Sequence, residues 1–197
     1  LPVRVDELGA DLLTVAAHKL YGPKGVGALY VREGVSLQPV LQGAGHEHGL
    51  RPGTENVAGI VGLGAACAAA AEVLPGDAGR VAALRDRLWQ ALRADGWLRN
   101  GHASEVLPNT LNASVEGADG MRLLELAPEV AASTGSACHT GRTEPSAVLR
   151  AMGVPEAVAL GAVRLSLGRW TTEAEVDAAS AALVKAARVA RTVPARR

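Results

Sequence analysis

Residues 12–31 read LLTVAAHKLYGPKGVGALYV, and this stretch indicates the fold class. The apolar run at 12–16 predicts a buried strand that ends at the pair His18 and Lys19. A turn cluster, YGPKG, comes next, and the run VGALYV at 26–31 predicts the returning strand. Farther along the chain, strand-like segments alternate with helical ones, which favours an α/β protein.

The segments that follow predict a boundary between two domains. Residues 42–54, QGAGHEHGLRPGT, predict a polar, glycine-rich loop that is too long for a simple connector. A helix is expected at 55–73, where three glycines permit close packing, and the sequence LPGD at 74–77 is expected to end it. We therefore predict two domains, 1–76 and 77–197.

The second predicted domain has a smaller α+β pattern. Short strands are expected at 110–115, 129–132 and 163–167. Helices are expected at 77–95, 120–126 and 145–152, and a last helix begins with the capping box TEAE at 172–175.

The composition disfavours several classes of function. The 197 residues include 20 basic and 20 acidic side chains, and zero net charge disfavours a surface for nucleic acid or anionic lipid. The longest uncharged stretch, residues 57–71, is shorter than a membrane span and predicts a buried helix, so we expect no membrane association. Two cysteines form no disulfide framework, and no signal or transit peptide is recognised, so we expect a reducing, cytoplasmic location.

Two side chains are candidate nucleophiles. Lys19 follows an apolar strand, where desolvation favours the neutral amine that forms a Schiff base; the alternative is a solvated head on a buried stem. Cys138 lies in the polar loop TGSACHTG, beside His139 and near Arg142, a setting that favours the reactive thiolate. The alternative for Cys138 is an incidental surface cysteine. Cys67, inside an alanine-rich helix, is expected to be a small core residue.

Binding residues are also expected. Arg164 lies among apolar residues of a predicted strand and needs a carboxylate or phosphate partner, which is either a ligand or an internal salt bridge. His46 and His48 resemble a pair of metal ligands, but no third ligand is evident, so we expect no metal site.

Five motifs then suggest a family. They are AHKLYGPKG at 17–25, RPGTEN at 51–56, LPNTLN at 107–112, STGSAC at 133–138 and RLSLGR at 164–169. In this order and spacing, over residues 1 to about 190, they resemble the pyridoxal-phosphate-dependent cysteine desulfurases of the class V aminotransferase group. The loop after Cys138 resembles the branch that serves iron–sulfur assembly, and RPGTEN and ACH also resemble selenocysteine lyases.

The resemblance implies a fold-type-I transferase and a role for each matching residue. Lys19 would hold the cofactor and move the substrate α-proton. His18 would hold the cofactor phosphate, with Thr54 reaching across a homodimer interface. Arg164 would bind the substrate carboxylate, and Asn112 would line the substrate side.

The same resemblance makes Cys138 the nucleophile that takes sulfur from L-cysteine as a persulfide, releases L-alanine and passes the sulfur to an acceptor or iron–sulfur scaffold protein. It also makes Cys138 a candidate transient iron–sulfur ligand.

Length is the largest departure from the family pattern. Members are roughly twice as long, so the chain resembles a C-terminal half. Residues 1–76 would be the end of the pyridoxal-phosphate-binding large domain, and 77–197 the small domain. The half absent from this sequence normally carries the acid that pairs with the pyridine nitrogen, so we expect no activity from residues 1–197 alone. Selenocysteine lyase, or a non-catalytic half-enzyme that only binds partners, are the alternative functions.

Overall fold

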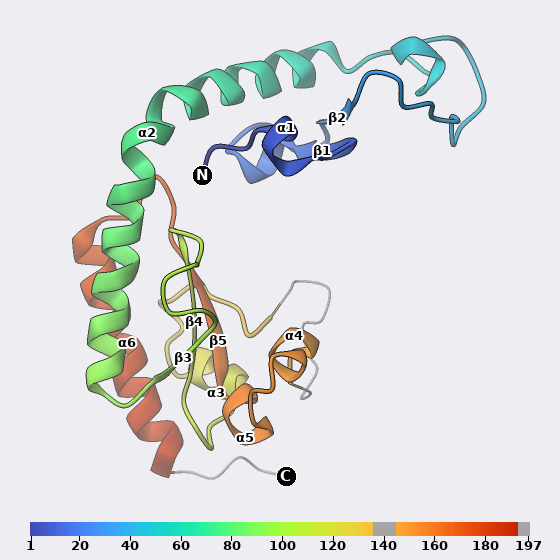
Figure 1. The fold of residues 1–197 in the computed structure, drawn as a ribbon. Helices are drawn as coiled ribbons and strands as arrows, with labels where there is room; N and C mark the ends of the chain where they lie inside the picture. Colours follow the sequence, from blue (N-terminus) through green and yellow to red (C-terminus); the bar gives the residue numbers. More distant parts are fainter. Residues whose placement is uncertain (136–144, 193–197) are drawn as a thin grey trace. The chain divides into compact units, whose positions relative to one another are not determined.

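The computed structural model describes residues 1–135 and 145–192, and the chain forms two compact units (Figure 1). Unit 1 is Leu1–Pro75 and unit 2 is Gly76–Arg197. This division lies one residue before the boundary that we placed between 76 and 77. That these units are parts of a large cofactor-binding domain and a small domain stays a prediction.

Unit 1 contains an antiparallel ribbon of two strands. Its elements are α1 (Val5–Leu8), β1 (Leu12–Ala16), the 3₁₀ turn η1 (Ala17–Lys19), β2 (Gly27–Val31), the 3₁₀ turn η2 (Glu47–Gly49) and the first part of α2 (Val57–Ala94). Leu12 pairs with Val31 and Ala16 with Gly27, so the predicted hairpin is confirmed. Glycine is required at Gly27, because a Cβ there would lie 2.5 Å from the Val15 carbonyl oxygen.

The prediction that the first strand is buried is wrong within this chain. No residue of β1 is buried, and Leu12 keeps 46% of its surface exposed. The physical reason is that two strands cannot bury their own faces, and in the described residues no third strand joins the ribbon.

Helix α2 continues where the sequence predicted its end. It runs from Val57 to Ala94 with Pro75 inside it, so the expected stop at LPGD does not occur. Proline removes one backbone hydrogen bond, which weakens a helix but does not have to end it. The helix formers that follow bury one face in the core of unit 2, through Val81, Leu84, Leu88 and Leu92. This packing outweighs the local preference of the proline.

The first part of α2 is mostly exposed, which contradicts the predicted buried helix. Leu63 is buried, and Gly62 lies so close to the Gly22-Pro23 turn that a Cβ would come 2.5 Å from the Pro23 ring. Val57 and Val61 are exposed, and so is Cys67, which is therefore not a core residue. The reason is that only one narrow stripe of the helix meets the rest of unit 1.

Helix α2 is also long and apolar enough to cross a membrane by length and composition. It has 38 residues, and its most apolar window has a mean hydropathy of 2.0 and is 11% buried. The uncharged stretch 57–71 is by itself shorter than a membrane span, but the helix that contains it is not, because α2 continues to Ala94. Core helices of globular proteins also pass this test, but the residues of α2 that are buried in a core belong to its second part.

Unit 2 is built on a three-stranded antiparallel sheet in the order β3 (Leu98–Asn100), β4 (Thr110–Ser114), β5 (Ala162–Ser166). One face carries Leu111, Ala113, Val163 and Leu165 into the core. Figure 1 shows α2 and α6 (Glu173–Thr192) on that side, and α4 (Ala147–Ala151) and α5 (Glu156–Ala159) on the other. The face opposite the core therefore lies toward the short helices α4 and α5 (Figure 1).

The predicted elements of unit 2 are mostly confirmed. Helix α3 (Gly120–Glu125) and helix α4 lie within their expected ranges, as do β4 and most of β5. The strand predicted at 129–132 is wrong, because these residues turn and only Ser133, just after them, pairs with the sheet. Strand β3 was not predicted, since three residues are too few to show a period.

The capping box at the start of α6 is confirmed. The Thr172 amide donates to Glu175 Oε2 at 2.8 Å, and the Glu175 amide donates to Thr172 Oγ1 at 3.2 Å. The first of these bonds, with a further one from the Thr172 hydroxyl, lowers the pKa of Glu175 below its ordinary value. In the same helix, hydrogen bonds from Arg87 lower the pKa of Asp177.

Candidate functional site

A row of polar residues crosses the face of the sheet opposite the core. Asn100 pairs with Asn112 in the register of β3 and β4, and Asn112 pairs with Arg164 in the register of β4 and β5. Directly opposed residues point to the same side of a sheet, and neighbours along a strand point to opposite sides. Asn112 lies between two buried core residues, so the row faces away from the core. The sequence predicted Asn112 and Arg164 as substrate-binding residues, and the structure brings these two together.

Ser133 extends this row beyond Arg164. The Arg164 amide donates to the Ser133 carbonyl oxygen at 2.6 Å, and the Ser133 amide donates back to Arg164 at 3.3 Å. The Ser133 hydroxyl also donates to the carbonyl oxygen of Gly135 at 2.7 Å. The segment that leads to Cys138 therefore starts beside Arg164. Cys138 itself lies outside the described residues.

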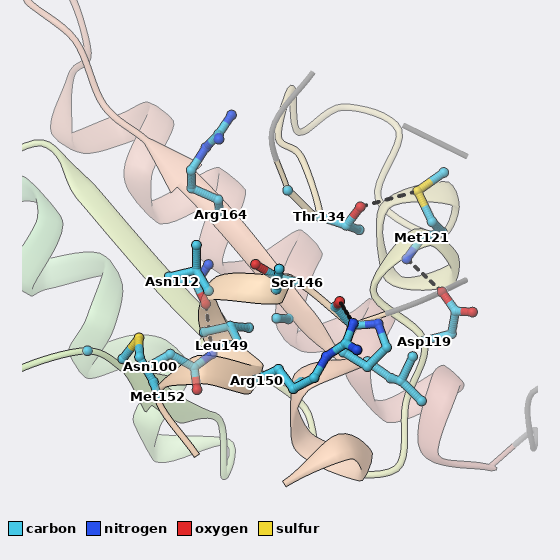
Figure 2. Close-up of a pocket in the computed structure, with 18 residues that line it drawn as sticks. Asn100, Asn112, Asp119, Met121, Thr134, Ser146, Leu149, Arg150, Met152 and Arg164 are labelled. Carbon is cyan, nitrogen blue, oxygen red and sulfur yellow. Dashed lines mark hydrogen bonds between the residues drawn. The ribbon is translucent and has the colours of Figure 1, made fainter. Parts of the chain in front are cut away.

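Three residues of the row, Asn100, Asn112 and Arg164, line a cavity of about 550 Å³ (Figure 2). Helix α3 contributes Asp119 and Met121, and Asp119 caps this helix by accepting from the Met121 amide at 2.7 Å. Helix α4 contributes Leu149 and Arg150. The Arg150 guanidinium donates to the Pro145 carbonyl oxygen at 3.4 Å, so it is already engaged within its own segment.

The hydrogen-bond capacity of the row is only partly used. Asn112 Oδ1 accepts from Asn100 Nδ2 at 2.7 Å, whereas no described residue accepts from Asn112 Nδ2. No described carboxylate lies within ion-pair distance of Arg164 either. The internal salt bridge, which was the alternative for Arg164, is thus not seen in the described part of the chain. Donors from two neighbouring strands that line the same cavity suit a carboxylate.

The predicted cofactor residues all belong to unit 1. His18 and Lys19 lie side by side in η1, directly after β1, and both are exposed. The desolvation expected around Lys19 is therefore not provided by the described residues, because the strand before it is itself only partly covered. Thr54 is exposed too, and Arg51 holds its backbone by donating to the Thr54 carbonyl oxygen at 3.0 Å.

These three side chains fit parts of pyridoxal phosphate by their chemistry. An amine suits the aldehyde, and an imidazole and a hydroxyl suit the phosphate. None of the three side chains is used in a hydrogen bond or ion pair with another described residue. Within the described residues, the side chains of Lys19, His18 and Thr54 are thus free to bind a ligand.

The described residues contain no comparable set of metal ligands. Within residues 1–135 and 145–192, no three His, Cys, Asp or Glu side chains gather in one place. His46 directly precedes η2 and His48 lies within it, where Glu47 and His48 both have positive φ.

Sequence reasoning missed Asn100 and Ser133. Asn100 ends a strand too short to be recognised, and the only local signal is the glycine after it. Gly101 has a φ of 108°, a value that favours glycine, and it turns the chain away directly after Asn100. Ser133 was assigned to a loop, because a single pairing residue has no sequence pattern.

Comparison with known proteins gives consistent matches. Residues 1–179 match the family described as Aminotransferase class-V. The chain is 46% identical over 182 residues to a cysteine desulfurase of Gluconacetobacter diazotrophicus, covering 90% of this chain and 45% of that protein. It is 44% identical over 190 residues to the cysteine desulfurase IscS of Histophilus somni, covering 95% of this chain and 47% of that protein.

A solved structure agrees with these matches. A NifS-like protein superposes with a TM-score of 0.84 at 36% identity, covering 98% of this chain and 50% of that one. The chain thus spans about half the length of the relatives that it matches. The fold-type-I class expected from the sequence is confirmed.

Proposed function

The chain belongs to the aminotransferase class-V family, and from this membership we propose that it contributes the C-terminal half of a pyridoxal-phosphate-dependent cysteine desulfurase. In this proposal, L-cysteine is converted to L-alanine and its sulfur stays on the enzyme as a persulfide. The observation that carries the proposal is the pair Asn112 and Arg164. Their unpartnered donors share one cavity wall with the start of the segment that leads to Cys138.

The residues of unit 1 hold the cofactor in this proposal. When bound, pyridoxal phosphate draws electrons from the substrate Cα and weakens the bonds next to it. Lys19 holds the aldehyde end and moves the proton at Cα. His18 holds the phosphate together with Thr54 of a second subunit, so the proposal includes a homodimer.

The residues of unit 2 hold the substrate. Arg164 donates two parallel hydrogen bonds to the substrate carboxylate, as a guanidinium does with a planar acid. Asn112 Nδ2 donates from the neighbouring strand to the same group. This contact fixes the amino acid by its carboxylate, so the sulfur end is left for another residue.

Cys138 is the proposed sulfur acceptor. Its thiolate attacks the sulfur of L-cysteine, so that an S–S bond forms while the bond between Cβ and sulfur breaks. The bonding electrons of the broken bond stay with the carbon, which takes up a proton and leaves as alanine. The outer sulfur of this persulfide then passes to an acceptor or iron–sulfur scaffold protein, which breaks the S–S bond and restores the Cys138 thiolate. A cytoplasmic location is part of the same proposal.

The test is a reconstitution. The chain is mixed with pyridoxal phosphate and with the N-terminal half of the Gluconacetobacter diazotrophicus relative, and alanine formed from L-cysteine is measured. We expect alanine only from the mixture, and none from the chain alone or from a Lys19→Ala mixture.

Failure of a folded mixture to release alanine from L-cysteine would refute the desulfurase function. Release from selenocysteine alone would replace the proposed function with that of a selenocysteine lyase.

A further inference from the structure

Asn100 has no part in the proposed function, yet its side chain donates two hydrogen bonds on the face of the polar row. Its Nδ2 donates to Asn112 Oδ1 at 2.7 Å and to Ser114 Oγ at 2.7 Å. Ser114 is fully buried, so one of these two hydrogen bonds ends on a fixed partner. Asn100 also lines the same cavity as Asn112 and Arg164.

These hydrogen bonds decide which way the Asn112 amide faces. A side-chain amide has an oxygen that accepts and, on its other side, a nitrogen that donates. Figure 2 shows the oxygen of Asn112 turned toward Asn100, which leaves the nitrogen as the free end. Rotation of the amide by half a turn would present an acceptor to the cavity, and an acceptor repels a carboxylate.

We propose that Asn100 is a positioning residue that holds the Asn112 amide with its N–H groups toward a ligand carboxylate bound by Arg164. The inference rests on the proposed function in one respect: the carboxylate is taken to be that of the amino-acid substrate. Asn100 itself does not touch the ligand. Its effect on binding passes through Asn112.

A purely structural role for Asn100 would be to tie β3 to β4. Ser114 separates the two roles, because it receives the second hydrogen bond of the same Asn100 amide. If the tie between the strands is what matters, Ser114→Ala and Asn100→Ala should have the same effect. If the orientation of Asn112 matters, only the change at Asn100 should weaken carboxylate binding.

The experiment is a titration of the full chain with L-alanine. Binding is monitored by nuclear magnetic resonance, through the signals of the Asn112 side-chain amide and the Arg164 Nε. We expect Asn100→Ala to raise the dissociation constant about tenfold, as loss of one oriented hydrogen bond to a charged group does. Ser114→Ala should change it less than about twofold. Asn100→Leu, which keeps the side-chain size without a donor, should match Asn100→Ala.

A double-mutant cycle tests whether the effect passes through Asn112. In an Asn112→Ala background, Asn100→Ala should change the dissociation constant less than about twofold. Wild-type affinity in the folded Asn100 variants, or an equal loss in Ser114→Ala, would overturn the positioning role.

The inference and the proposed function can fail separately. Normal release of alanine from L-cysteine by the reconstituted mixture, without any binding of L-alanine at the row, would refute the inference alone. Binding that depends on Asn100, in a mixture without desulfurase activity, would support the inference and refute the function.

Discussion

Replacing Arg164 by alanine should separate binding from stability. Its guanidinium has no acidic partner in the described part of the chain, so its removal leaves no buried carboxylate unpaired. We therefore expect the free energy of unfolding to fall by no more than about 1 kcal/mol. Breaking an internal buried salt bridge would instead cost about 3–5 kcal/mol.

The effect on ligand binding should be much larger. A hydrogen bond to a charged group contributes about 1.5–3 kcal/mol, and a guanidinium forms two with a carboxylate. Loss of about 3 kcal/mol corresponds to a dissociation constant for L-alanine that is raised more than about a hundredfold. Arg164→Lys keeps the charge but loses the planar fork, so it should fall between alanine and wild type.

Two measurements and one control decide the case. Urea unfolding of unit 2 gives the stability, and titration with L-alanine gives the affinity. Arg150→Ala is the matched control, because Arg150 lines the same cavity but donates to the Pro145 carbonyl oxygen. We expect it to change the affinity less than about threefold. If the Arg164→Ala chain loses about 3 kcal/mol of stability and still binds L-alanine normally, Arg164 is a structural residue and not a ligand-binding one.

Three further outcomes are expected. In the reconstituted mixture, Cys138→Ser should keep the absorbance of bound cofactor but form no persulfide, which is measured by thiol labelling. The control Cys67→Ser should change turnover and stability little, because Cys67 is exposed. Gly161→Ala should lower the free energy of unfolding of unit 2 by about 2 kcal/mol in urea, since its Cβ would overlap the backbone of Val115. Gly79→Ala, in a helix with open space around it, should instead raise that free energy by about 0.5–1 kcal/mol. Because the pKa of Glu175 is lowered in the folded chain, its contribution to stability is complete above the ordinary pKa of 4.5 and is lost as the pH falls below that value. Glu175→Gln should therefore make the unfolding temperature fall less steeply between about pH 6 and about pH 3. An unchanged slope would contradict this role of Glu175.

Local features of the fold could be predicted from the sequence because they depend on neighbouring residues. The hairpin of β1 and β2 follows from two apolar runs around a glycine-rich turn, and the capping box of α6 from Thr172 and Glu175 three residues apart. The same locality explains the errors. Pro75 is a strong local signal for a helix end, but core packing from outside that window keeps α2 continuous.

Candidate catalytic and cofactor-binding residues could be named from motifs alone, as for Cys138, Lys19, His18 and Thr54. Their surroundings could not be predicted, because burial depends on which other segments pack against them. Lys19 follows an apolar strand and Cys67 lies inside an apolar helix, yet both side chains are exposed in this chain.

The polar row exists only in the folded chain. Asn100, Asn112, Ser133 and Arg164 come from four segments that are far apart in sequence, and no local pattern relates them. Strand register places them opposite one another, because the alternating core residues of β4 and β5 must face the helices and so turn these four to the other side. Residues able to bind a carboxylate could thus be named from their side-chain types and motifs, whereas the pairing of the strands was needed to bring two of them, Asn112 and Arg164, into one cavity.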